Sequence, residues 1–329
     1  MIKTKSLLKS AIFLMLLVAL VACGNDQGED GKETIVFGDS GWDSLRFHNE
    51  VARTIVEEGY GYPTEQTAGS SEMVWTAVRE GDIDVHMEGW TKNLGDIYTE
   101  GIESGDFVKM SVNFDDSFQG FYVPRYVIEG DPERGIEPMA PDLEYVTDLP
   151  EYWELFQDPE DSSKGRIIGA ISGWSVDEIL FQAFEEYGLD ETYNYFRAGS
   201  EAGINASLAD AYEKGEPWIG YNYEPNWVLG KYDMVPLTEE DPEGILNNAA
   251  NQDVNVVAHK SLLERAPEVA EFLKNYQTTS ELANEALKYI SDEGATPKEA
   301  AIKFLKEEEG IWTEWVPEDV ADAVKESIQ

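Results

Sequence analysis

The sequence contains very little cysteine and histidine. Among its 329 residues there is one cysteine, Cys23, and there are three histidines, His48, His86 and His259. A single cysteine excludes a disulfide within the chain, a thiolate metal cluster and a cysteine nucleophile in the folded body. The histidines lack metal-ligand spacing, and the chain has no Gly-x-Ser-x-Gly motif. We therefore expect neither a metal nor another cofactor, and no enzymatic activity.

Positive charge is also scarce. The chain has 24 Lys+Arg against 66 Asp+Glu, which gives a formal net charge of -42 at pH 7. Nucleic acid and anionic lipid surfaces are poor partners for such a negative field. Adaptation of an exported protein to a salty or alkaline medium is the interpretation we favour, and electrostatic gathering of cations is the alternative.

The N-terminus is typical of an exported lipoprotein. Lysines at 3, 5 and 9 precede an apolar run over 11–20, and Leu-Val-Ala-Cys follows at 20–23. This order is that of a secretory signal, and the run is shorter than the ~20 residues needed to span a bilayer. The junction resembles the bacterial lipobox, so residues 1–22 are expected to be the signal peptide, Cys23 the lipidated residue and 23–33 a tether. The protein would then sit on the extracellular face of a bacterial cell membrane.

Short apolar strands alternate with helical patterns along the rest of the chain. This rhythm predicts an α/β protein with parallel sheets covered by helices. The expected strands are 34–38, 83–85, 166–171 and 218–223, and the expected helices run from about 44 to 59, from 72 to 80, from 175 to 187 and through much of the chain after 267. Ser175 and Glu178 are expected to form a capping box at the start of the third helix.

Aromatic residues follow the predicted strands, where open α/β sheets place their ligands. These residues are Trp42, Trp90, Trp174, Tyr223 and Trp227. Each taken alone is more simply explained by core packing. Together they indicate a cage for a quaternary ammonium group, because such a group cannot donate an N–H hydrogen bond and aromatic faces attract it by cation–π interaction.

Two further positions bear on the rest of the ligand. Backbone N–H groups around Gly173 could bind a carboxylate tail, although an ordinary helix start explains that segment equally well. Asp43 could attract a cation or accept a hydrogen bond from a hydroxyl group. Its alternative role is the N-cap of the helix that begins near Ser44.

The chain resembles the glycine betaine/choline substrate-binding family of ABC importers over nearly all of its mature length. The segments that carry the resemblance are Gly-Trp-Asp-Ser at 41–44, Glu-Gly-Asp-Ile-Asp-Val at 80–85, Glu-Gly-Trp at 88–90, Gln-Gly-Phe-Tyr-Val-Pro-Arg-Tyr-Val at 119–127, Ser-Gly-Trp at 172–174 and Tyr-Glu-Pro-Asn-Trp-Val at 223–228. The resemblance implies a two-lobe fold of the type II periplasmic-binding-protein kind, with ligand in the interlobe cleft. Lobe 1 would comprise 34–122 and 258–329 and lobe 2 would comprise 123–257, with crossings near 122–126 and 254–259.

By position, the family's cage carries over onto Trp42, Trp90 and Tyr223, with Tyr122 and Trp174 as further wall. Where a Trp-x-Pro pattern is expected, the chain has Tyr223-Glu-Pro-Asn-Trp at 223–227, so Tyr223 and Trp227 both remain candidates.

The implied function is uptake of glycine betaine for osmoprotection, by a monomer that delivers its ligand to an ABC permease and its ATPase. A choline- or carnitine-specific protein of the same fold is the alternative. A surface glycosidase or a sugar-binding lipoprotein is a distant one.

Overall fold

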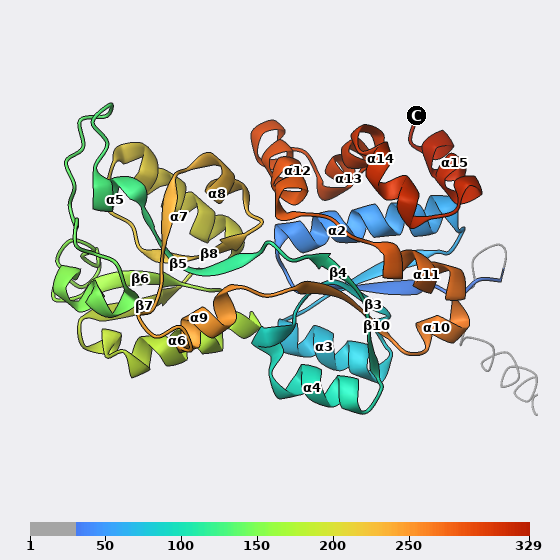
Figure 1. Cartoon of the computed structure of the whole chain (residues 1–329), viewed down its shortest axis with the longest axis horizontal. Helices are drawn as coiled ribbons and strands as arrows, with labels where there is room; N and C mark the ends of the chain where they lie inside the picture. Colours follow the sequence, from blue (N-terminus) through green and yellow to red (C-terminus); the bar gives the residue numbers. More distant parts are fainter. Residues whose placement is uncertain (1–30) are drawn as a thin grey trace, which may run out of the picture.

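The structure is a computed structural model that describes residues 31–329, so the expected signal peptide and Cys23 lie outside the described residues. Two five-stranded sheets lie side by side, each covered by helices, and they divide the molecule into two lobes (Figure 1). We call the half that contains the first sheet lobe 1 and the half that contains the second sheet lobe 2. This arrangement agrees with the predicted two-lobe α/β fold.

Lobe 1 holds a mixed sheet whose strands come from both ends of the described chain. The strand order is β2-β1-β3-β10-β4. The strands are β1 (Ile35–Asp39), β2 (Thr64–Ala68), β3 (Val85–Trp90), β4 (Phe107–Phe114) and β10 (Val254–His259). Strands β2, β1 and β3 are parallel, whereas β10 runs antiparallel to β3 and β4. The antiparallel β10 is how the chain returns to lobe 1 after completing lobe 2.

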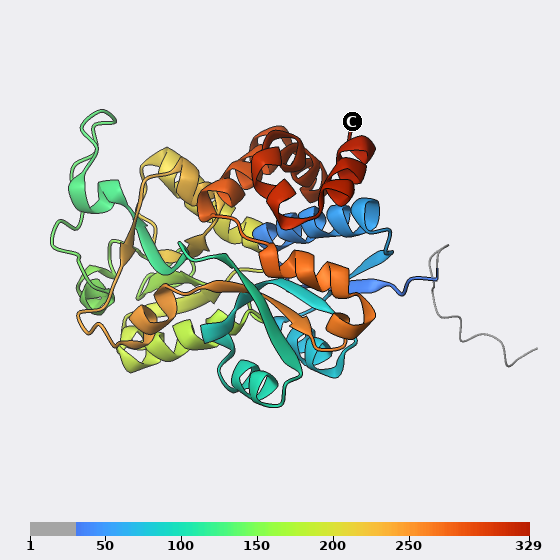
Figure 2. The same ribbon diagram turned by 45° about the vertical axis from the view of Figure 1, so that its right-hand side comes forward.

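Helices cover both faces of the lobe 1 sheet. Helix α2 and the C-terminal helices lie on one face, and α3 and α4 lie on the other (Figures 1 and 2). The helices are α2 (Asp43–Thr54) with its π-helical continuation (Ile55–Gly59), α3 (Ser71–Glu80), α4 (Asp96–Glu103), α10 (Leu262–Arg265), α11 (Pro267–Asn275), α12 (Ser280–Glu293), α13 (Pro297–Glu307), α14 (Glu309–Trp312) and α15 (Glu318–Ser327). A short 3-10 helix (Thr91–Leu94) follows β3, and another (Thr313–Trp315) follows α14. Trp312 and Trp315 are 0% and 5% exposed, which confirms that these two tryptophans belong to the core.

Lobe 2 repeats the same plan. The strand order is β7-β6-β8-β5-β9, with β6, β7 and β8 parallel and β5 antiparallel to both of its neighbours. The strands are β5 (Phe118–Pro124), β6 (Gly165–Gly169), β7 (Tyr193–Arg197), β8 (Gly220–Glu224) and β9 (Met234–Leu237). The helices are α5 (Arg125–Glu129), α6 (Ser175–Glu186), α7 (Glu201–Lys214), α8 (Trp227–Lys231) and α9 (Ile245–Ala250), with 3-10 turns at Val146–Tyr152 and Leu189–Glu191.

The chain changes lobe earlier than the sequence led us to expect. Strand β5 pairs from Phe118 onward with β8 and β9 in lobe 2, and β10 pairs with β3 and β4 in lobe 1. The crossings therefore lie at residues 115–117 and 251–253, not near 122–126 and 254–259. The physical reason is that each apolar strand forms its ladder within one sheet, so the short polar segments before β5 and β10 make the passage.

The predicted starts of α2 and α6 agree with the structure, but the residues expected to cap them do not. Trp42 and Trp174 are the N-cap residues of α2 and α6, and neither cap has a side-chain hydrogen bond. Asp43 is therefore not an N-cap, and the predicted capping box of Ser175 is absent because Ser175 is already inside the helix. At α3 the hydroxyl of Ser70 accepts the N–H of Met73 at 3.4 Å, as expected for a serine cap.

No helix between residues 31 and 329 combines the length and the apolar character that a bilayer crossing requires.

Candidate functional site

An aromatic pocket lies between the two lobes. It encloses about 390 Å³ of empty space, including its open mouth. Its wall is mostly aromatic, with a few small polar side chains. The residues that line it are Trp42, Ser71, Trp75, Trp90, Asn93 and Leu94 from lobe 1 and Gln119, Trp174, Ser175, Val176, Tyr221 and Tyr223 from lobe 2. Since both lobes contribute to the wall, the pocket is complete only when they are closed together.

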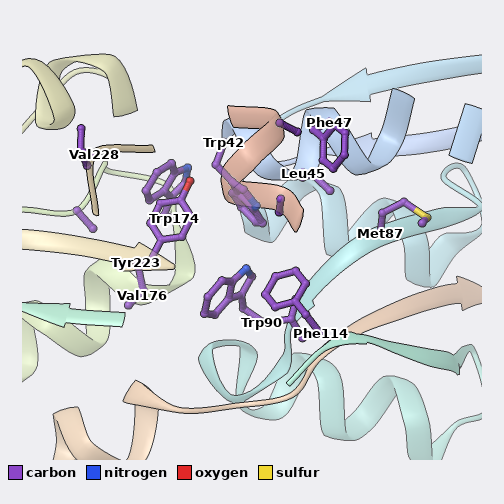
Figure 3. Close-up of a cluster of buried hydrophobic side chains, with 14 of the residues drawn as sticks. Trp42, Leu45, Phe47, Met87, Trp90, Phe114, Trp174, Val176, Tyr223 and Val228 are labelled. Atoms are coloured by element: carbon purple, nitrogen blue, oxygen red, sulfur yellow. The ribbon is translucent and has the colours of Figure 1, made fainter. Parts of the chain in front are cut away.

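Four of these rings form a chain of three edge-to-face pairs. The centroids of Trp42 and Trp174 are 5.8 Å apart at 84°, those of Trp174 and Tyr223 are 5.8 Å apart at 85°, and those of Trp90 and Tyr223 are 5.9 Å apart at 87°. Figure 3 shows the four side chains grouped where the two lobes face each other. We call Trp42, Trp90, Trp174 and Tyr223 the cage. Because each ring is perpendicular to the next in this chain, the cage presents faces in several directions and so fits a compact, round cation better than a flat ring.

The fold explains why these four residues meet. Trp42 follows β1, Trp90 ends β3, Trp174 lies between β6 and α6, and Tyr223 lies near the end of β8. The sequence predicted this placement, because the carboxyl ends of parallel strands in an α/β sheet converge on one edge. All four residues are nearly buried, with exposed fractions of 8%, 8%, 8% and 4% in chain order.

The first turn of α6 forms the polar end of the pocket. Ser175 and Val176 line the wall, and they are the first residues of a 12-residue helix whose cap donates and accepts no side-chain hydrogen bond. The first amides of a helix have no partner within it, and the helix dipole makes this end favourable for negative charge. The α6 N-terminus can therefore bind an anionic or strongly polar group.

Gly173 contacts the other lobe and does not line the pocket, although the sequence analysis expected its surroundings to bind a carboxylate. Its carbonyl oxygen accepts the N–H of Ser71 at 2.9 Å, which joins lobe 2 to the start of α3 in lobe 1. Its φ of +103° is a conformation that glycine adopts readily. Gly173 thus shapes the turn before α6 and contacts the other lobe, and the amides that line the pocket come two and three residues later.

Glu88 is a site residue that the sequence analysis missed. The side chain is fully buried, and its Oε2 atom accepts hydrogen bonds from the indole N–H groups of Trp42 and Trp90, the latter at 3.5 Å. The hydroxyl of Ser44 donates to the same oxygen at 3.1 Å. Burial raises the pKa of Glu88 to about 7, opposed by these three donors. The sequence did offer a signal for this residue, because Glu88 is the one acidic residue in the strand that ends at Trp90.

Glu201 is the second residue that was missed, and it joins the two lobes. It lies at the start of α7 in lobe 2, and its Oε2 accepts the backbone N–H of Asp43 in lobe 1 at 2.9 Å. Its Oε1 accepts the hydroxyl of Tyr223 at 2.7 Å and the amide of Asn226 at 3.0 Å. Burial, and then the nearby charge of Asp43, raise the pKa of Glu201 to about 8. In the sequence it looks like an ordinary acid in a first helical turn.

Three predicted site residues besides Gly173 lie outside the pocket wall. The carboxylate of Asp43 contacts Arg46 at 3.2 Å. Tyr122 is 3% exposed and packs on Phe118 with centroids 5.8 Å apart. Trp227 lines a separate, acidic hollow on the surface, so Tyr223 and not Trp227 stands in the cage. Direct contact of Asp43, Tyr122 or Trp227 with a ligand stays a prediction.

The remaining polar side chains of the wall are largely bonded to one another. The amide groups of Asn93 and Gln119 exchange hydrogen bonds of 2.9 Å and 3.3 Å, and the hydroxyl of Tyr221 donates to Gln119 at 3.2 Å. No acidic or basic side chain is among the lining residues. Among the residues that the structure describes, no group of histidine, cysteine and carboxylate side chains could hold a metal ion.

Comparison with known proteins decides the family. Residues 33–307 match the family model described as the substrate binding domain of ABC-type glycine betaine transport systems. The chain belongs to this family. It is therefore the extracellular-facing, substrate-binding component of an ABC importer of the glycine betaine class, as the sequence resemblance implied.

Individual relatives are distant, and they cover between about half and nearly all of this chain. The trimethylamine N-oxide-binding protein of Pelagibacter ubique is 25% identical over 325 residues, which are 93% of this chain and 99% of that protein. The glycine betaine/carnitine transport binding protein GbuC of Listeria monocytogenes is 27% identical over 162 residues, 48% of this chain and 52% of its own.

Solved structures confirm the fold. A choline-binding protein of an ABC transporter in complex with choline has a TM-score of 0.74 at 21% identity, and the match covers 90% of this chain and 98% of that one. The closed, glycine betaine-bound form of lactococcal OpuAC has a TM-score of 0.68 at 20% identity, covering 86% of this chain and 99% of that one.

Proposed function

We propose that the protein captures glycine betaine, or a closely related quaternary ammonium compound, in the cage. The observation that carries this proposal is the set of three perpendicular ring pairs within 6 Å that line one interlobe pocket. Each desolvated aromatic face contributes on the order of 0.5–2 kcal/mol to binding of a cation. Several such faces together supply useful affinity for a solute of only a few atoms.

The polar end of the pocket supports a zwitterion as the preferred ligand. The amides at the start of α6, near Ser175 and Val176, suit the carboxylate of glycine betaine. A net cation such as choline would find no carboxylate in the pocket wall to neutralise its charge or accept its hydroxyl. Glycine betaine is therefore the first choice over choline, and carnitine, a longer zwitterion, is a further alternative.

Trimethylamine N-oxide is a second candidate. A relative that aligns over 93% of this chain is named for binding that compound. Its N-oxide oxygen carries negative charge directly beside the methylated nitrogen, so it would reach the α6 amides only if the cage held it closer to them than glycine betaine requires.

Closure of the lobes would couple capture to transport. Since Trp42 and Trp90 come from lobe 1 and Trp174 and Tyr223 from lobe 2, ligand should favour the closed form. We infer that the closed monomer then docks on the permease, which is coupled to a cytoplasmic ATPase. Lipidation of Cys23 would hold the protein at the membrane, with uptake serving osmoprotection.

Calorimetric titration of residues 24–329 tests the proposal. Glycine betaine, choline, carnitine, trimethylamine N-oxide and proline form the ligand panel. The matched control is 3,3-dimethylbutanoate, which has the shape of glycine betaine but a neutral carbon in place of nitrogen. Micromolar binding of glycine betaine, with 3,3-dimethylbutanoate at least about 100-fold weaker, is the expected result. Equal binding of the two would contradict the cage mechanism, and silence from every methylated ammonium or N-oxide compound would contradict the function.

A further inference from the structure

One buried carboxylate connects the two lobe 1 tryptophans of the cage. Glu88 lies on β3, two residues before Trp90, and none of its side chain is exposed. Its Oε2 atom accepts the indole N–H of both Trp42 and Trp90 and the hydroxyl of Ser44. Three donors thus converge on a single oxygen, and Glu88 itself is not among the residues that line the pocket.

The other oxygen of Glu88 has no hydrogen-bond partner. Glu88 Oε1 lies 3.5 Å from the Nε2 atom of His48, and both atoms are buried without a hydrogen bond. The Nδ1 atom of His48 is 2.8 Å from the hydroxyl of Tyr276. Burial lowers the pKa of His48 to about 3, so this histidine is neutral and supplies no positive charge to the carboxylate. An ionised Glu88 therefore lacks a counter-ion among these contacts.

We propose that Glu88 is a positioning residue of the cage and that its negative charge strengthens the attraction of Trp42 and Trp90 for a bound cation. This inference rests on the proposed function. An anion that accepts an indole N–H polarises the ring and makes its face more negative, which increases cation–π attraction. The charge also acts directly on the cation, because the intervening medium is buried protein in which Coulomb energies are larger than in water.

The arrangement predicts that ligand binding depends on pH. Burial raises the pKa of Glu88 to about 7 in the closed protein without ligand. A cation in the cage favours the ionised carboxylate, so the pKa of Glu88 should fall when ligand binds. Affinity should then be lowest near pH 5.5, rise as the pH passes through about 7, and level off above about 8. Near neutral pH, binding should release a proton.

Of the titratable groups near Glu88, only Glu201 could also make ligand binding depend on pH in this range. Groups that face Glu88 come from α2, from β3, from β8 and from the end of α11. They are His48, His86, Tyr223 and Tyr276. Burial lowers the pKa of both histidines to about 3 and raises the pKa of both tyrosines, so all four are neutral between pH 5.5 and 8.5. Beyond them, on the other side of the cage, Glu201 faces Asp43 and Arg46, and its raised pKa of about 8 requires a control variant of its own.

Glycine betaine titrations from pH 5.5 to 8.5 test the inference on the wild type and on matched variants. The wild type should bind glycine betaine at least about fivefold more tightly at pH 8.5 than at pH 5.5. The heat of binding should depend on the ionisation enthalpy of the buffer, because the buffer takes up the released proton. Glu88→Gln keeps an oxygen for the indole N–H groups but cannot ionise. It should bind more weakly at pH 8.5 and show a flat profile.

Three further variants separate positioning from charge. Glu88→Ala should bind more weakly than Glu88→Gln at every pH, since it loses the acceptor as well. Glu201→Gln should keep most of the wild-type slope. Glu239→Gln removes a buried carboxylate that bonds Leu246 and Asn247 in lobe 2, outside the cage, and should keep both affinity and slope.

A flat wild-type profile, or a slope that survives in Glu88→Gln, would overturn the inference while leaving the proposed function intact. Absence of binding at every pH would instead count against the proposed function. In that case the tryptophan fluorescence of the ligand-free protein still tests Glu88, because ionisation beside two indole N–H groups should change the emission with a midpoint near pH 7. A wild-type transition that persists in Glu88→Gln would overturn the inference there too. If Glu88→Gln fails to fold, the dependence of the binding heat on buffer in Glu201→Gln decides the matter. A dependence that persists in Glu201→Gln supports Glu88 as the source of the proton, and its loss would overturn the inference.

Discussion

At the scale of single residues, the four cage rings are distinguished from the candidate Trp227 by the pocket that they line. Trp90 is 8% exposed, as a core residue would be, yet it lines the pocket and stands perpendicular to Tyr223. Trp227 was an equal candidate from the sequence, and it lies on a different, acidic hollow. Truncation of these two tryptophans should therefore have different consequences.

Trp90→Ala should weaken binding of glycine betaine by more than about tenfold, because it removes one cation–π face and opens the pocket. Trp227→Ala should change affinity by less than about twofold. Calorimetry on both variants, with thermal melts to confirm folding, measures the difference. Near-normal affinity in Trp90→Ala would remove that ring from the cage, and a large loss in Trp227→Ala would return it to the list of contacts.

At the scale of secondary structure elements, the ends of strands and helices place most of the site. The pattern of strand followed by aromatic residue predicted Trp42, Trp90, Trp174 and Tyr223, since that pattern is local in sequence. Glu201 could not be found in this way. Its partners Asp43 and Tyr223 are 158 and 22 residues away, and the contact with Asp43 forms only when the two lobes are closed together. The lobe crossings were misplaced for a related reason, because sheet membership is set by pairing between distant strands.

Glu201 predicts how closure is stabilised. Its two oxygens bind the first amide of α2 in lobe 1 and the cage hydroxyl of Tyr223 in lobe 2, so they tie the α2 N-terminus to the cage. Glu201→Ala should weaken affinity about tenfold or more, chiefly by faster dissociation, because a buried hydrogen bond between the lobes is lost and its partner groups are left unpaired. Small-angle scattering with saturating glycine betaine should show a smaller compaction than in the wild type. Wild-type dissociation and full compaction in this variant would contradict the role of Glu201 in closure.

At the scale of the whole molecule, acidity and ligand chemistry make separable predictions about salt. With 66 acidic against 24 basic residues, like-charge repulsion opposes folding and is screened by salt. The melting temperature should therefore rise between about 0.05 M and 1 M NaCl, where the Debye length falls from more than ~10 Å to ~3 Å.

If the acidity is an adaptation to salt, it need not assist binding. The affinity for zwitterionic glycine betaine should then change by less than about threefold over that range, and choline should show a similarly shallow dependence. If the negative surface gathers cations instead, the association rate of choline should fall steeply with salt while that of glycine betaine stays constant, because only choline carries a net charge to be steered. Stopped-flow tryptophan fluorescence with both ligands at low and high salt distinguishes the two roles, and the interpretation as salt adaptation fails if choline alone slows.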